Sequence, residues 1–299
     1  MLDIVILTDH RYVNPEKVDW YTQQVLDEDR LLQTALENKG LTVCKKDWAD
    51  KNFDWTSSKY AIFRTTWDYF ERFDEFFIWL EDTKKKTTFI NSSEIINWNI
   101  DKHYLQDLAK NKVNIAPTLF VEKGDRITLA QLFDKANWKE AVLKPAISGA
   151  ARQTYRIHPN NCSEFETLFQ KLIENESMLF QEFLNNIITQ GEISLILIGG
   201  KYTHAVKKIA KKGDFRVQDD HGGTVEQYIA TESEIKFAKK CLEKCQYSPI
   251  YARVDVVYDN NNKLSLSELE LIEPELWFRN KPESATLLAE EVFSLLSSK

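Results

Sequence analysis

The chain has 299 residues, of which 43% are hydrophobic and 28% charged, so it can bury a large core in two or three domains. Its formal net charge of -7 disfavours nucleic acid as the main partner, although a local group of basic side chains can still bind an anionic nucleotide. No stretch reaches the ~18 apolar residues of a membrane span. The first apolar run resembles a strand rather than a signal peptide, and four cysteines without a CxxC pair indicate reduced thiols. We therefore expect a cytoplasmic protein.

Residues 1 to about 89 alternate between short apolar runs and segments of helical spacing. This alternation predicts a parallel sheet with covering helices. The segment RTTWDY at 64–69 is expected to form a turn after the third strand, and 91–99 a polar connection. The expected strands are 4–7, 41–44, 60–63 and 88–90, and the expected helices are 27–38 and 73–80.

From about residue 101 the pattern changes to longer strands separated by turns. Gly199 and Gly200 adjoin two of these strands and predict a hairpin. The expected strands are 118–121, 140–144, 154–157, 178–184, 194–198, 201–208, 250–258 and 264–272, and the expected helices are 101–110, 163–174, 233–245 and the segment from Pro282 onward.

One candidate phosphate site consists of Lys144, at the end of an apolar strand, and the small-residue loop 148–151 that follows it. Small residues such as Ser148 and Gly149 let backbone N–H groups approach phosphate oxygens, and the lysine adds a positive charge. An ordinary strand with a flexible hairpin has the same pattern. It is not a Walker A loop, because the lysine precedes the glycine.

An apolar strand at 178–184 could stack on adenine, with Glu192 accepting hydrogen bonds from the ribose. A core strand with a surface glutamate is the simpler interpretation of that segment. The following basic segment offers Lys207, Lys208 and Arg216 to a γ-phosphate or a substrate carboxylate. A solvated basic loop is the alternative there.

The last motif is acidic: Asp255 follows Arg253 on one strand face, and Glu268 and Glu270 share a face of a later strand. If the two strands pair, three carboxylates converge, which is costly unless a cation neutralises them. Such oxygen ligands suit Mg²⁺, which also bridges nucleotide phosphates. A strand with one buried face and one solvent-exposed face would show the same alternation. Strict alternation places Glu273 on the opposite face and makes it the weakest candidate.

In this order, these motifs resemble the ATP-grasp superfamily over nearly the whole chain. The segment GDFRVQ at 213–218 with the following Gly222 is similar to the branch of glutathione synthetase and the ribosomal-protein-S6-modifying ligases. A bacterial subgroup that includes the D-cycloserine-forming cyclo-ligase resembles the chain more narrowly. The strings that carry this narrower resemblance are RTTWDY at 64–69, NWNIDK at 97–102, GEISL at 191–195, YARVD at 251–255 and ELELIEP at 268–274.

The resemblance implies an α/β (α+β) ATP-grasp fold. Residues 1–98 would form a Rossmann-like N-terminal domain on the substrate side, 99–182 a central lid subdomain, and 183–299 a C-terminal subdomain with the metal site. It also implies ATP and Mg²⁺, with Mn²⁺ as a substitute. Many relatives have Asn where this chain has Glu270. The implied nucleotide ligands are Lys102, Lys144, Ser148, Gly149, Gln181, Glu182, Phe183, Leu184, Glu192 and Lys207, and the implied metal ligands are Asp255, Glu268 and Glu270.

The resemblance further implies a ligase that activates a carboxylate as an acyl phosphate and joins it to an amine, giving an amide or a cyclic amide. Arg253 and Arg216 would stabilise the acyl-phosphate stage. Arg64 and Trp67 would face a small amino-acid-like or peptide substrate beyond the strand ends, although Trp67 is as well explained by packing between domains. A small-molecule kinase and a catalytically silent ATP-binding regulatory module are the alternatives. Relatives are often dimers, so a homodimer is expected.

Overall fold

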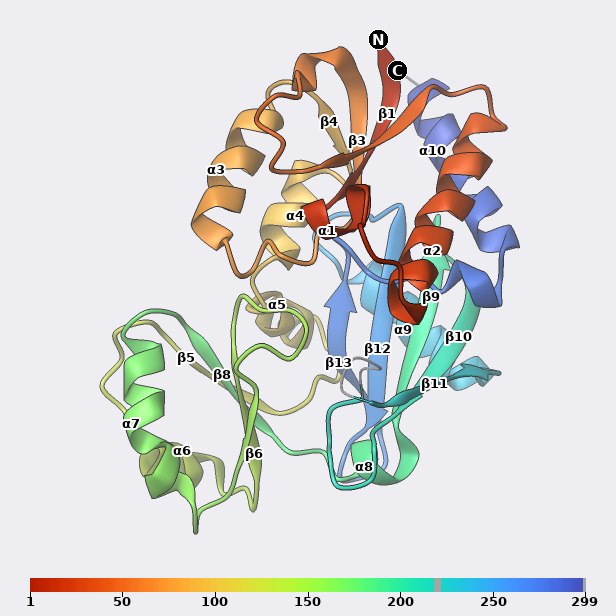
Figure 1. Ribbon diagram of the computed structural model, residues 1–299. Coiled ribbons are helices and arrows are strands. Elements are labelled where there is room, and N and C mark those ends of the chain that lie inside the picture. The colour runs from red at the N-terminus through yellow and green to blue at the C-terminus, as the bar shows by residue number, and fades with distance from the viewer. Residues whose placement is uncertain (218–221, 298–299) are drawn as a thin grey trace.

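The computed structural model describes residues 1–217 and 222–297, and it contains three sheets (Figure 1). The mixture of a parallel sheet and two antiparallel sheets agrees with the predicted fold class. None of the helices within the described ranges combines the length and the apolar character that a bilayer crossing requires.

The N-terminal sheet has four parallel strands in the order β2-β1-β3-β4. Ile4 and Ile6 of β1 pack toward α2 and α10, whereas Val5 and Leu7 pack toward α3 on the other face. Both faces are covered, which is why β1 is apolar throughout. The elements are β1 (Leu2–Thr8), α1 (His10–Val13), α2 (Trp20–Glu37), β2 (Val43–Asp47), η1 (Trp55–Ser57), β3 (Ser58–Thr65), α3 (Phe73–Thr83), β4 (Thr88–Ile90) and α4 (Ser93–Asn99).

The central sheet is antiparallel, with the order β5-β8-β6-β7, and has a core of its own beneath α6 and α7. Its helix α6 begins with a capping box between Thr128 and Gln131. The elements are β5 (Thr118–Val121), α6 (Leu129–Ala136), β6 (Ala141–Pro145), β7 (Tyr155–Ile157), α7 (Cys162–Ile173) and β8 (Met178–Glu182).

The C-terminal sheet is antiparallel, with the order β11-β10-β9-β12-β13. Gly199 and Gly200 join β9 to β10 with φ of 56° and 72°, which confirms the predicted hairpin. The elements are α8 (Asn186–Gln190), β9 (Glu192–Ile198), β10 (Lys201–Ile209), β11 (Thr224–Tyr228), α9 (Glu232–Glu243), β12 (Tyr251–Tyr258), β13 (Leu264–Glu270), η3 (Phe278–Asn280) and α10 (Glu283–Ser297).

The first and last sheets share one hydrophobic core, in which Ile4 and Ile6 meet Ile196 and Tyr251. Helix α5 (Tyr104–Lys110) also packs with the C-terminal sheet, although the predicted division groups it with residues 99–182. The boundaries at residues 98 and 182 stay a proposal. The separate core of the central sheet makes that lobe, at the lower left of Figure 1, distinct from the rest of the protein.

Three local predictions were wrong. Helix α2 begins at Trp20, seven residues before its predicted start, because the Asp19 side chain accepts the Thr22 N–H at 2.8 Å and caps it. Residues 93–99 form helix α4 where a polar connection was expected. Strand β3 continues through Thr65, so Arg64 belongs to a strand and not to the turn.

Candidate active site

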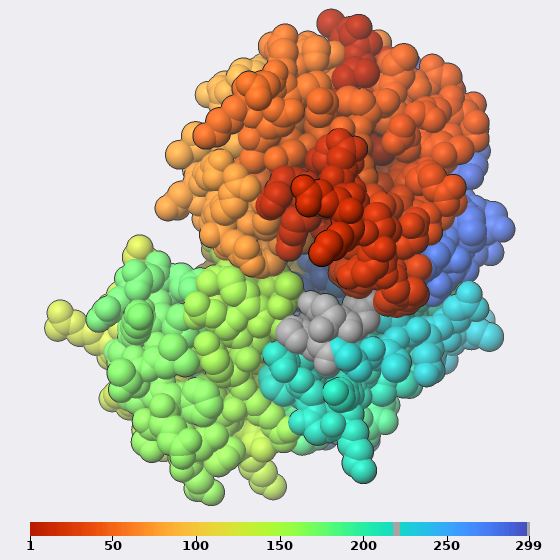
Figure 2. Space-filling model, viewed as in Figure 1, coloured from red at the N-terminus to blue at the C-terminus, as the bar shows by residue number. Residues whose placement is uncertain are grey.

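A cleft of about 460 Å³ lies where the three sheets meet, a size suited to a bound small molecule. In Figure 2 the red and orange N-terminal region, the green central region and the cyan region around β10 and β11 come together on one face. The cleft walls include the segment after β3, the loop after β6, the end of β8 and the paired strands β12 and β13.

Two lysines, Lys102 and Lys144, lie in the cleft wall, as the sequence predicts. The Lys102 ammonium donates to the Ser148 carbonyl and forms an ion pair with Glu268 at 3.1 Å. Within the described residues no carboxylate lies at ion-pair distance from Lys144, and burial lowers its pKa, against the opposing effect of Glu268. A cation buried in this way gains from an arriving anion.

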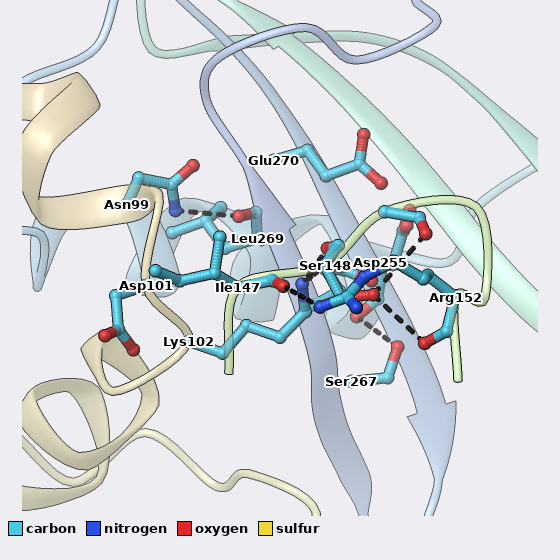
Figure 3. A network of polar contacts seen from close by, with 12 residues as sticks. Asn99, Asp101, Lys102, Ile147, Ser148, Arg152, Asp255, Ser267, Leu269 and Glu270 are labelled. Atoms are coloured by element: carbon cyan, nitrogen blue, oxygen red, sulfur yellow. Dashed lines mark hydrogen bonds and ion pairs between the residues drawn. The ribbon is translucent and has the colours of Figure 1, made fainter. Parts of the chain in front are cut away.

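The carboxylates lie on paired strands, which is the condition that the predicted convergence required. Antiparallel register places Asp255 opposite Glu268 and Arg253 opposite Glu270, with an irregularity after Asp255. Arg253 donates to Asp255 at 2.9 Å and also contacts Glu270. Lys208 reaches Asp255 at 3.2 Å, so protein cations compensate these charges. Figure 3 shows Asp255 on strand β12 close to the loop that follows β6.

The carboxyl groups differ in their pKa values. Burial alone would raise the pKa of Asp255, but Arg253 and Lys208 lower it to about 2. Burial raises the pKa of Glu270 to about 8, because Arg253 only partly offsets it and Glu268 and Asp255 add negative charge nearby. An added cation would favour the ionised form of Glu270, which is the behaviour expected of a metal or phosphate site.

The small-residue loop after β6 is tightly held. Ala150 and Ala151 adopt left-handed conformations with φ of 47° and 52°, which are unfavourable for residues with a Cβ atom. Arg152 forms an ion pair with Glu176 and donates to the Ile147 carbonyl at 3.1 Å, as drawn in Figure 3. Gly149 lies against the Phe70 ring, where an added Cβ would come within 2.5 Å.

The predicted adenine segment lines the cleft, from Gln181 at the end of β8 to Leu184. Two of its backbone N–H groups are already hydrogen-bonded within the protein. The N–H of Glu182 donates to the Pro117 carbonyl at 2.8 Å, and the N–H of Phe183 donates to Glu140 at 3.0 Å. These two donors are engaged within the protein, so Leu184 is the remaining candidate donor.

Glu192, the predicted ribose acid, also lines the cleft. It contacts Lys208 and accepts a hydrogen bond from the Ser267 hydroxyl at 2.8 Å. The basic segment offered both Lys207 and Lys208, the resemblance implied Lys207, and the structure places Lys208 at the cleft instead. Alternation along β10 turns Lys207 toward the Tyr228 ring, 5.6 Å from its centroid, and places Lys208 in the cleft wall.

Arg216 lines the cleft as predicted, and its guanidinium donates to Asp214 at 2.7 Å. Gln218, the last residue of the GDFRVQ string, lies outside the described residues.

Arg64 does not line the cleft, and its predicted substrate contact is wrong. Its side chain is buried, forms an ion pair with Glu28 at 2.9 Å and lies over the Phe278 ring. Because β3 extends past it, Arg64 points into the junction between the first and last sheets. Trp67 does line the cleft, with Tyr12 and Tyr21 packed against its ring.

Known proteins resemble the chain in both parts of this architecture. The family of prokaryotic glutathione synthetase ATP-grasp domains matches residues 106–273, and the N-terminal domain of D-cycloserine synthetase DcsG matches residues 4–91. The cycloserine biosynthesis protein DcsG of Streptomyces lavendulae is 27% identical over 259 residues, which cover 82% of this chain and 86% of that protein.

The family match spans more than half of the chain and contains the adenine segment, strand β10 and the paired strands β12 and β13. The chain belongs to the ATP-grasp family. It is therefore an ATP-grasp ligase and uses ATP.

Solved structures share the ATP-grasp fold. The crystal structure of D-cycloserine synthetase DcsG superposes with a TM-score of 0.86 at 24% identity and covers 98% of this chain and 99% of that chain. D-alanine–D-alanine ligase from Bacillus anthracis superposes with a TM-score of 0.66 at 14% identity, covering 98% and 97%. The fold thus extends over the whole ATP-grasp chain, including the N-terminal sheet.

Sequence reasoning assigned no role to the cleft residues Tyr69 and Trp277, and it gave little weight to Glu273. Trp277 lies beneath Arg253, 5.1 Å from its guanidinium carbon, and is held in a left-handed conformation. Glu273 was given the lowest weight because strict alternation faced it away. Strand β13 ends at Glu270, so that alternation does not apply to Glu273. The neighbouring Pro274 was the available signal that the strand ends.

Proposed function

We propose that this protein is an ATP-dependent carboxylate–amine ligase that acts on a small amino-acid-like substrate through an acyl phosphate. The observation that carries the proposal is that Lys102, Lys144 and the carboxylates of β12 and β13 line one cleft together with the adenine segment. Such an arrangement suits a triphosphate whose terminal group is transferred to a carboxylate.

The substrate side supports a small molecule. Trp67 and its aromatic neighbours Tyr12 and Tyr21 form the cleft wall contributed by the N-terminal sheet region. The relatives are named for cycloserine biosynthesis and for joining D-alanine to D-alanine. We infer from both that the acid and the amine are amino acids or close derivatives, joined as an amide or a cyclic amide.

Mg²⁺ would be held by Asp255, Glu268 and Glu270. Among the described residues, no three acidic, histidine or cysteine side chains are grouped so as to hold a metal ion by themselves. The donor set nevertheless fits Mg²⁺, which usually takes one or two carboxylates and completes its shell with water and phosphate oxygens. The raised pKa of Glu270 marks a place where added positive charge is favourable. When bound, the ion would supply charge neutralisation at the phosphates.

The residues of the chain have separable roles in this proposal. Lys102 and Lys144 neutralise phosphate oxygens, and the loop at Ser148 and Gly149 covers them and excludes water, which would hydrolyse an acyl phosphate. Arg253 stabilises charge at the carboxylate being activated. Arg216, which lines the same cleft between β10 and β11, would assist there.

The test is a screen for ADP release with amino acids, dipeptides and ureido or hydroxamate analogues, with hydroxylamine added as a trap and products identified by mass spectrometry. A ligase yields ADP, phosphate and a hydroxamate from the activated acid. A stable phosphorylated product without hydroxamate would indicate a kinase instead. ATP binding without ADP release in every mixture would indicate a silent binding module.

A further inference from the structure

Glu273 differs in its partners from the cleft carboxylates of β9 and β13. Glu268 is paired with Lys102, Glu270 with Arg253, and Glu192 with Lys208. Within residues 1–217 and 222–297, no basic side chain lies at ion-pair distance from Glu273. Its carboxylate instead forms a hydrogen bond with the Tyr69 hydroxyl. A carboxylate without a cationic partner is the better proton acceptor.

The backbone at Glu273 is fixed from several sides. The Trp67 indole N–H donates to its carbonyl at 3.0 Å, and the Tyr251 hydroxyl donates to the Ile272 carbonyl at 2.7 Å. Pro274 restricts the conformation of the residue before it. The carboxylate is thus held in place by the N-terminal region and by β12 before any substrate arrives.

The position of Glu273 is on the substrate side of the cleft. It follows Glu270, the last of the predicted metal ligands, and it contacts Trp67 and Tyr69 of the N-terminal region. The adenine segment at 181–184 comes instead from β8 of the central sheet and the residues after it. A group at Glu273 therefore meets the acid or the amine and not the base of the nucleotide.

The ionisation of Glu273 is compatible with proton transfer near neutral pH. Burial raises its pKa to about 7, while Tyr69 and Lys102 act to lower it and Glu268 acts to raise it. Burial also raises the pKa of Tyr69 far above its usual value, so this phenol stays an O–H donor. Glu270 adds negative charge from the neighbouring end of β13.

We propose that Glu273 accepts the proton of the attacking amine in the second half-reaction. This inference rests on the proposed ligase function. The nitrogen lone pair forms the C–N bond with the acyl carbon, the bond from that carbon to the phosphate oxygen breaks, and phosphate leaves with the electron pair. An ammonium group loses two protons on its way to an amide: one passes to the Glu273 carboxylate and frees the nitrogen lone pair, and the other leaves with the phosphate. Tyr69 orients this carboxylate and acts as a positioning residue.

The experiment compares two products in Glu273→Gln, using D-alanine or whichever amino acid releases more ADP in the screen above. Hydroxylamine trapping reports formation of the acyl phosphate, and amide formation reports the second step. We expect amide formation to fall about 100-fold, since a general base contributes at least this much. Hydroxamate formation should stay within about fivefold of wild type, because hydroxylamine is largely uncharged at pH 7 and needs no base to release its lone pair.

Further variants separate a proton acceptor from a structural role. In the pH–rate profile of the wild-type protein, amide formation should fall as the pH drops below about 7. This acidic limb of the profile should be absent in Glu273→Gln. Tyr69→Phe removes a hydrogen bond that lowers the pKa of Glu273, so the limb should move to higher pH. Glu273→Asp should recover part of the activity. Glu243→Gln, an exposed site on α9, is the matched control.

Each result decides the matter. Equal loss of hydroxamate and amide in Glu273→Gln, or amide formation that keeps its rate and its acidic limb, would overturn the role of Glu273. Absence of hydroxamate from the wild-type protein with every acid would instead reject the proposed ligase function. Unchanged thermal unfolding of Glu273→Gln confirms that the comparison concerns folded protein, and Tyr69→Phe supplies the same test if that variant is unstable.

Discussion

Two groups of buried charges in this protein have similar chemistry but different surroundings. The cleft group is built around Arg253, Asp255 and Lys208, and it lines an open volume. The junction group pairs Arg64 with Glu28, between the first and last sheets. Glu28 uses its remaining acceptor capacity on backbone N–H groups of residues 276 and 278.

The comparison shows that a buried ion pair becomes a functional site only when it faces space that a ligand can enter. In the junction group Glu28 accepts from Arg64 and from the backbone N–H groups of residues 276 and 278, so it joins helix α2 to that segment. The cleft group leaves Lys144 without a near carboxylate among the described residues and Glu270 with a raised pKa of about 8. Its arrangement is completed by an arriving anion and cation.

The largest expected effect is on the cleft group. Lys144→Met should lower ATP turnover by at least about 1,000-fold, because a fixed charge on the transferring phosphate is worth several kcal/mol. Thermal unfolding should be unchanged or shifted upward, since burial disfavours the charged lysine.

The matched control for this variant is Lys207→Met, whose side chain lies over Tyr228 and outside the cleft wall. Turnover in this control is expected within about threefold of wild type. If Lys144→Met released ADP at the wild-type rate, the assignment of Lys144 as a phosphate ligand would be wrong.

The junction group should respond in the opposite manner. Glu28→Gln leaves the buried Arg64 guanidinium without its counter-ion and should lower the free energy of unfolding by about 3–5 kcal/mol. Turnover per folded molecule should change little. Urea unfolding and ADP release measured on the same preparation check both statements, and loss of activity without loss of stability would contradict the distinction between the two groups.

A smaller effect is expected from pH at His204, which is buried beside Ser284 of α10 at 3.3 Å. Burial lowers its pKa to about 4, against about 6.5 in an unfolded chain. The unfolded state therefore binds more protons, and stability falls as the pH drops from about 6.5 to 4, by about 3 kcal/mol.

Urea unfolding at pH 7 and pH 4 tests this expectation. His204→Gln should lose about 3 kcal/mol less than wild type over that interval, because a glutamine does not titrate. An equal loss in both proteins would show that His204 keeps its ordinary pKa.

The smallest expected effect sharpens the cleft side of the comparison. In Gly149→Ala the new Cβ would meet the Phe70 ring at 2.5 Å, and overpacking of this kind costs about 1–3 kcal/mol. The KM for ATP should rise about tenfold as the loop is pushed off its position. Adding Phe70→Leu to Gly149→Ala should restore most of the affinity for ATP. If the double variant had the same raised KM as Gly149→Ala, the contact with Phe70 would not be the cause.

Several site residues could be predicted from the sequence because their signals are local. Lys144 with its small-residue loop, and the alternation of Glu268 and Glu270, each occupy a few consecutive positions on one strand. Period-2 geometry then decides which side chains share a face. The pairing of β12 with β13, which brings Asp255 to Glu268, was only a condition in that reasoning, and the structure supplies it.

The tertiary structure alone decided three other points. It turned Lys208 and not Lys207 into the cleft, because the exact register and orientation of β10 cannot be read from adjacent lysines. It buried Arg64 against a glutamate 36 residues earlier in the chain. It also brought Glu273 into the cleft beyond the end of its strand.

The sequence by itself determined the order of motifs, the type of sheet in each region and the family, because these depend on residue types at fixed short spacings. Only the tertiary structure decided which charges face the cleft and which face each other. Charges interact through space over a few ångströms, so their partners depend on strands and helices that are far apart along the chain.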